Sequence, residues 1–205
     1  SGDLLFGDIR ADHLLFRMNT YKGEKDTNLD KFIAAFDSGQ PSSGKKFLMK
    51  AKNVYLTNSH FLLFDENREN PKDADFSYLN ATASDFMIHG PVVSMDIKKM
   101  SFMDYRGLFV KEMSSRFTYT KKNIILSNLE LATRNSTFKG KVALNYKRED
   151  FQDFNNKVQF DIQIDKSLLA TNDIRYFYNE MGKDQVFAMR AHVTGALNDI
   201  TMTGL

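Results

Sequence analysis

The apolar and polar positions of this chain repeat one eight-residue rhythm five times. Apolar residues at the first, third, sixth and eighth positions enclose a polar pair, as in Met-Asp-Ile-Lys-Lys-Met-Ser-Phe at residues 95–102. Successive side chains of a strand point to opposite faces, so the change from odd to even positions would normally move the apolar residues to the other face. A β-bulge at the polar pair absorbs one residue and keeps them on the same face. The rhythm therefore predicts bent strands with one apolar face, at residues 9–16, 49–56, 81–88, 95–102 and 124–131.

Strand patterns fill most of the remaining chain. They cover residues 47–65, with an interruption near Asn58, then 76–146, 158–164 and 187–202. Turn signals such as Gly90-Pro91 and Lys121-Lys122-Asn123 punctuate the second stretch at intervals of about 10 to 14 residues, which is typical of an antiparallel meander. We therefore expect a mainly β protein with a largely antiparallel sheet.

Two short amphipathic helices interrupt the strand pattern. The first is predicted over residues 27–37, where Thr27 caps the helix and Asp30 reaches back to it. The second is predicted over residues 172–181, capped by Thr171 or Asn172 and ended by Gly182. Apolar residues at helical spacing form one stripe on each: Leu29, Phe32, Ile33 and Phe36 on the first, and Ile174, Phe177, Tyr178 and Met181 on the second.

The organisation of the chain suggests one β segment with a helical insertion. Residues 22–46 contain a charged turn, the first helix and a Gly- and Ser-rich connector at residues 39–46. Residues 1–205 otherwise form a single unit without a domain linker. Ser1-Gly2 resembles a cloning remnant, and the chain does not begin with Met, so we interpret it as an excised segment of a longer protein. We expect the sheet to continue beyond Leu205.

Composition narrows the function classes. The net charge is only +2, from 28 basic and 26 acidic residues, which does not favour nucleic-acid binding. The chain has no Cys, so disulfides and thiolate zinc sites are excluded, and it has no apolar run long enough to span a membrane. The abundant Phe (18) and Met (10) suit either an ordinary core or a surface that accepts irregular apolar partners.

The sequence contains no constellation of catalytic or metal-binding residues. Its histidines, His13, His60, His89 and His192, are widely separated, and no phosphate-binding loop or nucleophile elbow is present. The sequons at Asn80 and Asn135 are better explained by turn chemistry than by glycosylation. We expect no enzyme activity, no cofactor and no tightly bound metal. The apolar strand face is left as the main signal, and it could form either the core of a closed barrel or sandwich or the lining of an open curved sheet.

A collinear set of short motifs adds a resemblance. The chain resembles the periplasmic region of TamB-type translocation and assembly module proteins, in the AsmA-like superfamily of lipid-transport bridges. The likeness spans nearly the whole chain, and no single motif is diagnostic. It rests on Gly-Asp-Ile at 7–9, Thr-Tyr-Lys-Gly-Glu at 20–24, Thr-Asn-Leu-Asp at 27–30, Asp-Glu-Asn at 65–67, Phe-Met-Asp-Tyr-Arg-Gly at 102–107, Glu-Asp-Phe-Gln-Asp-Phe at 149–154 and Gly-Ala-Leu-Asn at 195–198.

This resemblance implies an open, taco-shaped groove with an apolar concave face. It implies the periplasmic part of a protein anchored in the inner membrane of a Gram-negative envelope. Two linked roles follow from it: conducting phospholipid between the inner and outer membranes, and supporting outer-membrane protein assembly with a TamA-like barrel partner. Regions outside this chain are expected to contact that partner. The family offers no catalytic residues to transfer.

We predict that eight apolar residues from the repeated rhythm line this groove and contact phospholipid acyl chains, while Lys98 and Lys99 point outward. An alternative hypothesis is a chaperone-like scaffold that guides outer-membrane strands without conducting lipid, by edge-strand addition. A third, weaker hypothesis is an enzyme or a carbohydrate-binding β-protein. The eight predicted groove residues are Phe16, Leu56, Phe86, Ile88, Met100, Phe102, Leu129 and Leu131.

Overall fold

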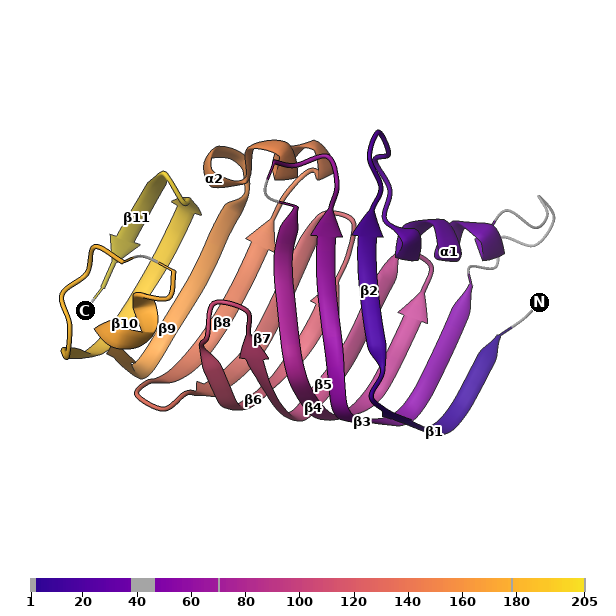
Figure 1. Cartoon of the computed structure of the whole chain (residues 1–205), viewed down its shortest axis with the longest axis horizontal. Helices are drawn as coiled ribbons and strands as arrows, with labels where there is room; N and C mark the ends of the chain where they lie inside the picture. Colours follow the sequence, from indigo (N-terminus) through magenta and orange to yellow (C-terminus); the bar gives the residue numbers. More distant parts are fainter. Residues whose placement is uncertain (1–2, 38–46, 70, 178, 205) are drawn as a thin grey trace.

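The computed structural model describes residues 3–37, 47–69, 71–177 and 179–204 and folds them into one curved sheet (Figure 1). The connector at residues 39–46 lies outside the described residues. From β3 onward each strand pairs antiparallel with the next, while β1 and β2 both pair with β3. The eleven strands are β1 Leu4–Asp12, β2 Leu15–Thr20, β3 Leu48–Asp65, β4 Lys72–His89, β5 Val92–Asp104, β6 Phe109–Tyr119, β7 Asn123–Ala132, β8 Thr137–Asn145, β9 Gln159–Ala170, β10 Val186–Ala196 and β11 Asp199–Thr203.

The sheet is folded into an open trough with two walls. In Figure 1, β2 and the adjoining parts of β3 and β4 pass in front of the fainter, more distant strands. Antiparallel strands place successive connections at alternate ends, so the trough has two rims. The front rim carries the connections after β2, β3, β5, β7 and β9, and the rear rim carries those after β4, β6, β8 and β10. The predicted mainly β, largely antiparallel, open curved sheet is confirmed.

Bulges bend the strands at most of the predicted polar pairs. The pairing register shifts at Ser84-Asp85 in β4, at Lys98-Lys99 in β5 and at Ser127-Asn128 in β7. Asp85 and Asn128 adopt positive φ angles of 53° and 51°, which Asp and Asn tolerate better than most residues. His13, also at positive φ, separates β1 from β2 in the first repeat. Four of the five repeats therefore bend where the rhythm places the polar pair.

The repeat at residues 49–56 is the exception. β3 keeps a regular register through Lys52 and Asn53, and its irregularity begins after Leu56, with Asn58 at a positive φ of 44°. The Asn58 side chain lies 2.8 Å from the His13 ring, and its backbone N–H donates to the Asn80 side chain at 3.0 Å. The bend in β3 thus aligns with the breaks in neighbouring strands, which a local pattern does not specify.

The first helix forms a crossover above the trough. α1 (Asn28–Asp37) connects β2 to β3, and these two strands are parallel, so the chain must return from the front rim to the rear rim before β3 begins. Thr27 and Asp30 form the predicted capping box: each backbone N–H donates to the side chain of the other residue, at 3.0 and 3.1 Å. The predicted helix at 27–37 is confirmed to within one residue.

The second predicted helix is much shorter than expected. α3 covers only Thr171–Ile174, and the chain then turns, so the prediction over residues 172–181 is wrong in extent. The Arg175 guanidinium donates to the backbone carbonyls of Asn179 and Met181, which folds the segment back on itself. Tyr178, part of the predicted stripe, lies outside the described residues. A 3₁₀ helix η1 (Arg148–Asp153) and the short α2 (Phe154–Lys157) were not predicted and sit between β8 and β9.

The molecule has far more surface than a closed fold of its size. Its accessible area is 12565 Å² for 23.6 kDa, whereas a compact monomer of that mass exposes about 9,800 Å². A barrel or sandwich would bury the inner faces of both walls and approach the compact value. The excess area agrees with a trough that is open to solvent.

Candidate apolar groove

The concave face of the sheet carries a continuous apolar lining. Three clusters of buried side chains follow one another along the trough, centred on Phe102 and Leu129, on Ile88 and Val93, and on Ile164. Met95 and Phe117 pack against both the first and the second cluster, and Phe138 packs against the first and the third. The lining therefore runs without interruption from β3 to β10.

All eight predicted groove residues lie on this lining or contact it. Phe102 and Leu129 are buried in the first cluster, and Ile88 is buried in the second. Phe16 stacks on Phe61, which packs against the first cluster, with a centroid distance of 5.7 Å. Leu56, Met100 and Leu131 pack against the first cluster. Phe86 packs against the second cluster.

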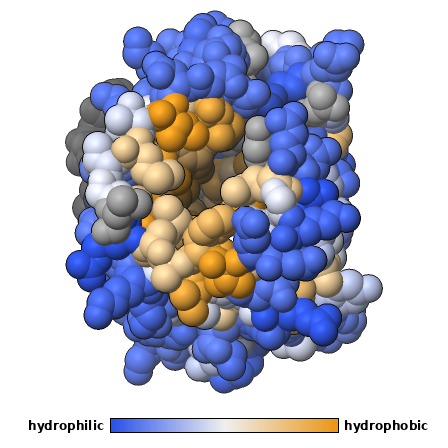
Figure 2. Space-filling model, turned by 90° about the vertical axis from the view of Figure 1, so that its left-hand side faces the viewer, coloured by the Kyte–Doolittle hydropathy of each residue, from blue (hydrophilic) through white to orange (hydrophobic). Residues whose placement is uncertain are grey.

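The lining has a packed floor and partly open walls. Phe102 is 7% exposed and Leu129 4%, so both belong to the floor. Phe16 is 44% exposed, and the apolar residues packed around the first cluster, Leu131 among them, are only partly buried. Figure 2 looks onto the C-terminal end of the trough and shows a hollow with an apolar lining inside a hydrophilic surface. The groove thus offers apolar area that the fold itself does not cover.

A row of four phenylalanine rings in contact runs across neighbouring strands to the floor of the groove; the first two ring pairs are stacked and the last is tilted. Phe16, Phe61, Phe76 and Phe102 come from β2, β3, β4 and β5, with successive centroid distances of 5.7, 5.8 and 4.3 Å. Cross-strand aromatic pairs stabilise a sheet beyond their buried area. Phe61 and Phe76 were not among the predicted groove residues. Phe61 alternates with Leu63 after the Asn58 break, and that signal could have identified it.

Helix α1 bridges the two walls at the N-terminal end of the trough. Its first residue, Asn28, accepts from the backbone N–H of Asn19 at 2.9 Å and donates to the Arg17 carbonyl at 2.8 Å, which ties the helix to β2. Leu29 packs against the second cluster. The Phe32 ring packs edge-on against the ring of Phe47, the residue before β3, with a centroid distance of 6.1 Å. The apolar side of α1 thus reaches from β2 to the start of β3.

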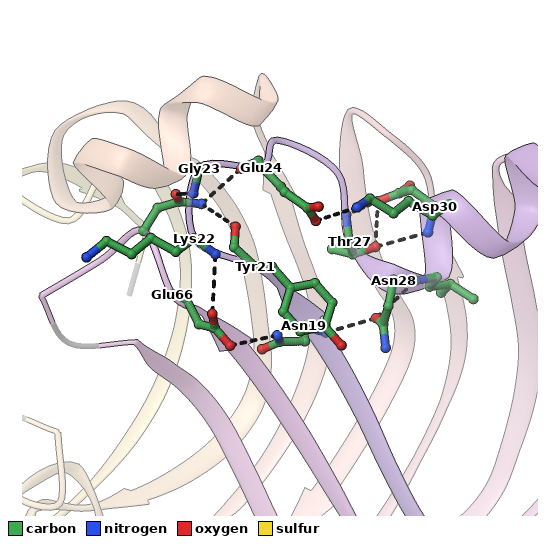
Figure 3. Close-up of polar contacts among 12 residues, drawn as sticks. Asn19, Tyr21, Lys22, Gly23, Glu24, Thr27, Asn28, Asp30 and Glu66 are labelled. Atoms are coloured by element: carbon green, nitrogen blue, oxygen red, sulfur yellow. Dashed lines mark hydrogen bonds and ion pairs between the residues drawn. The ribbon is translucent and has the colours of Figure 1, made fainter.

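A polar network holds this end of the front rim (Figure 3). Glu66 accepts from the side chain of Asn19 at 3.0 Å and from the backbone N–H of Lys22 at 3.3 Å. Glu24 pairs with Lys31 of α1 at 2.5 Å. The hydrogen bond from Asn19 lowers the pKa of Glu66 below its ordinary value. The network links the turn after β2 to the β3–β4 loop, and the contact between Glu24 and Lys31 ties α1 to this turn.

A second polar anchor ties α3 to the β7–β8 turn. The buried carboxylate of Asp173 accepts from Thr133 at 2.5 Å, Ser136 at 2.6 Å and Asn135 at 3.0 Å, all in the β7–β8 turn. Burial alone would raise the pKa of Asp173, but the hydrogen bonds from Ser136, Thr133 and Asn135 outweigh it and lower the pKa. The amide of Asn135 is occupied by this contact in the β7–β8 turn, in agreement with the predicted turn chemistry. Asn80 instead lies inside β4, where its amide bonds to Asn58 and Tyr78, so the turn interpretation is wrong for that sequon.

Two histidines acquire carboxylate partners that the sequence did not reveal. His60 lies 2.6 Å from Asp75, which also binds Lys72 at 2.7 Å. Burial acts to raise the pKa of Asp75, but hydrogen bonds from Lys72 and His60 lower it. In the same way His192 lies 2.7 Å from Asp161, and its hydrogen bond lowers the pKa of that carboxyl.

Neither histidine pair forms a catalytic constellation with a nucleophile. Among the described residues, no hydroxyl group lies within hydrogen-bond distance of the His60 or His192 ring. The part of the chain that the structure describes also holds no group of three or more His, Cys, Asp or Glu side chains that could bind a metal ion. The two histidine–carboxylate contacts join neighbouring strands, β3 with β4 and β9 with β10.

Comparison of the chain with models of protein families, with curated proteins and with solved structures gave no match. None of the helices in the described residues is long and apolar enough to cross a membrane. The resemblance to TamB-type proteins therefore stays a prediction.

Proposed function

We propose that this chain is a segment of a lipid-conducting groove, with phospholipid acyl chains lying on the concave face and headgroups at the mouth. The observation that carries the proposal is a continuous apolar lining that the fold covers only in part. Exposed contiguous apolar area is unfavourable in water, and in natural proteins it usually marks a binding surface. In a cell envelope, phospholipid moving between the inner and outer membranes would supply the missing apolar contacts.

The proposed setting follows the resemblance. The groove would belong to the periplasmic part of an inner-membrane-anchored protein of a Gram-negative envelope. It would support outer-membrane biogenesis together with a TamA-like barrel partner, contacted by regions outside this chain. The proposal includes no catalytic step, because lipid movement along a groove needs only binding and release.

A chaperone-like scaffold is the second candidate. The outer sides of β1 and β11 are unpaired in the described sheet, and both strands expose apolar side chains such as Leu5 and Met202. Unpaired edges can accept an extended segment of another chain by strand addition. This mode would leave the concave face free of lipid, so lipid capture separates the two candidates.

The test is crosslinking of the purified chain to a photoreactive phospholipid, with native mass spectrometry of copurified lipid. Leu131→Glu puts a charge on a partly buried lining position, so the chain should stay folded but lose most of its lipid capture. Lys99→Glu, at an exposed position in β5, is the matched control and should capture lipid like the wild type. Phe102 is unsuitable because a charge on the packed floor would unfold the protein. Unchanged capture by folded Leu131→Glu would rule out the groove.

A further inference from the structure

The rear rim carries a group of lysines without ion-pair partners. Lys121 and Lys122 form the β6–β7 turn, and Lys147 follows β8. The two connections are joined, because the backbone N–H of Tyr146 donates to the Lys122 carbonyl at 2.9 Å and the Tyr146 hydroxyl donates to the Thr120 carbonyl at 3.0 Å. Three ammonium groups therefore project from one stretch of the rim, which we call the rim lysines.

Some lysines of the described residues are paired with carboxylates, while others, such as Lys99 and Lys111, are exposed and show no ion pair with a described residue. Lys31, Lys72 and Lys139 lie 2.5, 2.7 and 2.9 Å from carboxylate oxygens of Glu24, Asp75 and Glu130. The rim lysines are also exposed and make no ion pair with any described residue, and they differ from the other unpaired lysines in lying together on two joined connections of one rim.

Acidic residues lie near Lys147 in the sequence but not near Lys121 and Lys122. No acidic residue occurs within seven positions of Lys121 or Lys122. Glu149 and Asp150 follow Lys147, and Asp150 accepts from the Lys147 backbone N–H at 2.6 Å. Positive charge is therefore concentrated on the β6–β7 turn.

The β6–β7 turn lies close to the apolar lining in sequence. Tyr119 packs against the second cluster, and Lys121 follows it by two residues, so their Cα atoms are at most about 7 Å apart. Phe117, two residues before Tyr119, packs against both the first and the second cluster. A ligand bound to the apolar side chains of this wall would therefore lie close enough to the β6–β7 turn for a lysine ammonium group to reach it.

We propose that Lys121, Lys122 and Lys147 bind the phosphate of a phospholipid headgroup whose acyl chains occupy the groove, and that they favour anionic over zwitterionic lipid. This inference rests on the proposed function and adds a headgroup site to it. The arrangement of apolar surface and cation matches the order of groups in a phospholipid, in which the phosphate follows the acyl chains. A free phosphate ion would gain nothing from the lining, so the ligand is the lipid headgroup.

The test compares two photoreactive lipids, phosphatidylglycerol and phosphatidylcholine, each as a trace component of phosphatidylcholine vesicles at low salt. The wild type should crosslink phosphatidylglycerol preferentially. Lys121→Glu with Lys122→Glu should lower phosphatidylglycerol crosslinking by at least about 25-fold, since each lysine near an anionic lipid contributes roughly fivefold to binding. Crosslinking of phosphatidylcholine should change much less. Lys22→Glu with Lys25→Glu, exposed on the front rim, changes the net charge equally and should keep the preference.

The outcomes separate the headgroup site from the groove. A preference that survives in Lys121→Glu/Lys122→Glu, or that disappears equally in the front-rim control, overturns the headgroup site and leaves the groove standing. A wild-type chain that crosslinks neither lipid overturns both. Inorganic phosphate at matched ionic strength should leave crosslinking unchanged; selective loss of phosphatidylglycerol crosslinking would instead assign the rim lysines to free phosphate.

Discussion

At the scale of single residues, Asp173 shows how one buried carboxylate shapes its surroundings. Three neutral side chains from the β7–β8 turn donate to it, and no cation compensates its charge among the contacts recorded for it. Hydrogen bonds to an ionised group are among the stronger ones, so this anchor holds α3 against the turn. The same contacts favour the ionised form of the Asp173 carboxyl, so the stability that this residue contributes depends on pH.

Asp173→Asn should lower the free energy of unfolding at neutral pH by about 1–3 kcal/mol, because an amide cannot accept all three bonds. The folded-state pKa of Asp173 is below its unfolded value, so its stabilisation is present above the unfolded pKa and is lost as the pH falls through the folded pKa. The difference between wild type and variant should therefore shrink below about pH 4. Urea unfolding at several pH values measures this; a difference that does not change with pH would contradict it.

Asn128 is the second informative residue, because it occupies the bulge of β7 at a φ of 51°. A β-branched side chain is strained at positive φ, so Asn128→Val should cost about 1–3 kcal/mol, whereas Asn128→Gly should be close to neutral. Thr118→Val, in the regular part of β6, serves as the control and should have little effect. Chemical denaturation compares the three, and equal stability of the Val and Gly variants would show that the bulge does not require positive φ.

At the scale of elements, α1 is the crossover that the parallel pairing of β2 and β3 demands. It is fixed to the front wall by its first turn and touches the rear wall through Leu29 and Phe32. A helix of 10 residues is marginal on its own, so its stability comes from these contacts.

Asn28→Ala removes both side-chain contacts of the helix with β2, and we expect amide hydrogen exchange in α1 to become faster while the sheet stays protected. Lys25→Ala, in the exposed turn before the helix, should leave α1 protection unchanged. Faster exchange throughout β3 and β4 would mean that α1 unfolds only together with the sheet.

At the scale of the whole molecule, the open trough has more surface and wider dimensions than a closed β fold. A compact chain of 205 residues has a radius of gyration of about 17 Å. We expect small-angle X-ray scattering of the monomer to give a clearly larger value, with a distance distribution that extends beyond that of a sphere. A radius at the compact value would indicate that the walls close on each other and leave no groove.

Local patterns in the sequence determined the apolar face of the strands, most of the bends and the first helix. Alternation assigns side chains to faces, and Asp or Asn at a polar pair tolerates the bulge, as at Asp85 and Asn128. The capping box of Thr27 and Asp30 involves residues three positions apart, so it is readable without knowledge of the fold. These features depend on neighbours in sequence, which is why all eight predicted lining residues lie on the apolar lining or contact it.

The tertiary structure alone decided which strands pair and where polar groups meet. The parallel pairing of β2 with β3, the alignment of Asn58 with His13, and the contacts of Asp173 all join residues at least 37 positions apart in sequence. Such contacts tie α3 to the β7–β8 turn and align the bend of β3 with the break between β1 and β2. Openness is likewise a property of the whole sheet, because the same alternation suits a barrel, and only the position of both walls leaves the apolar face uncovered.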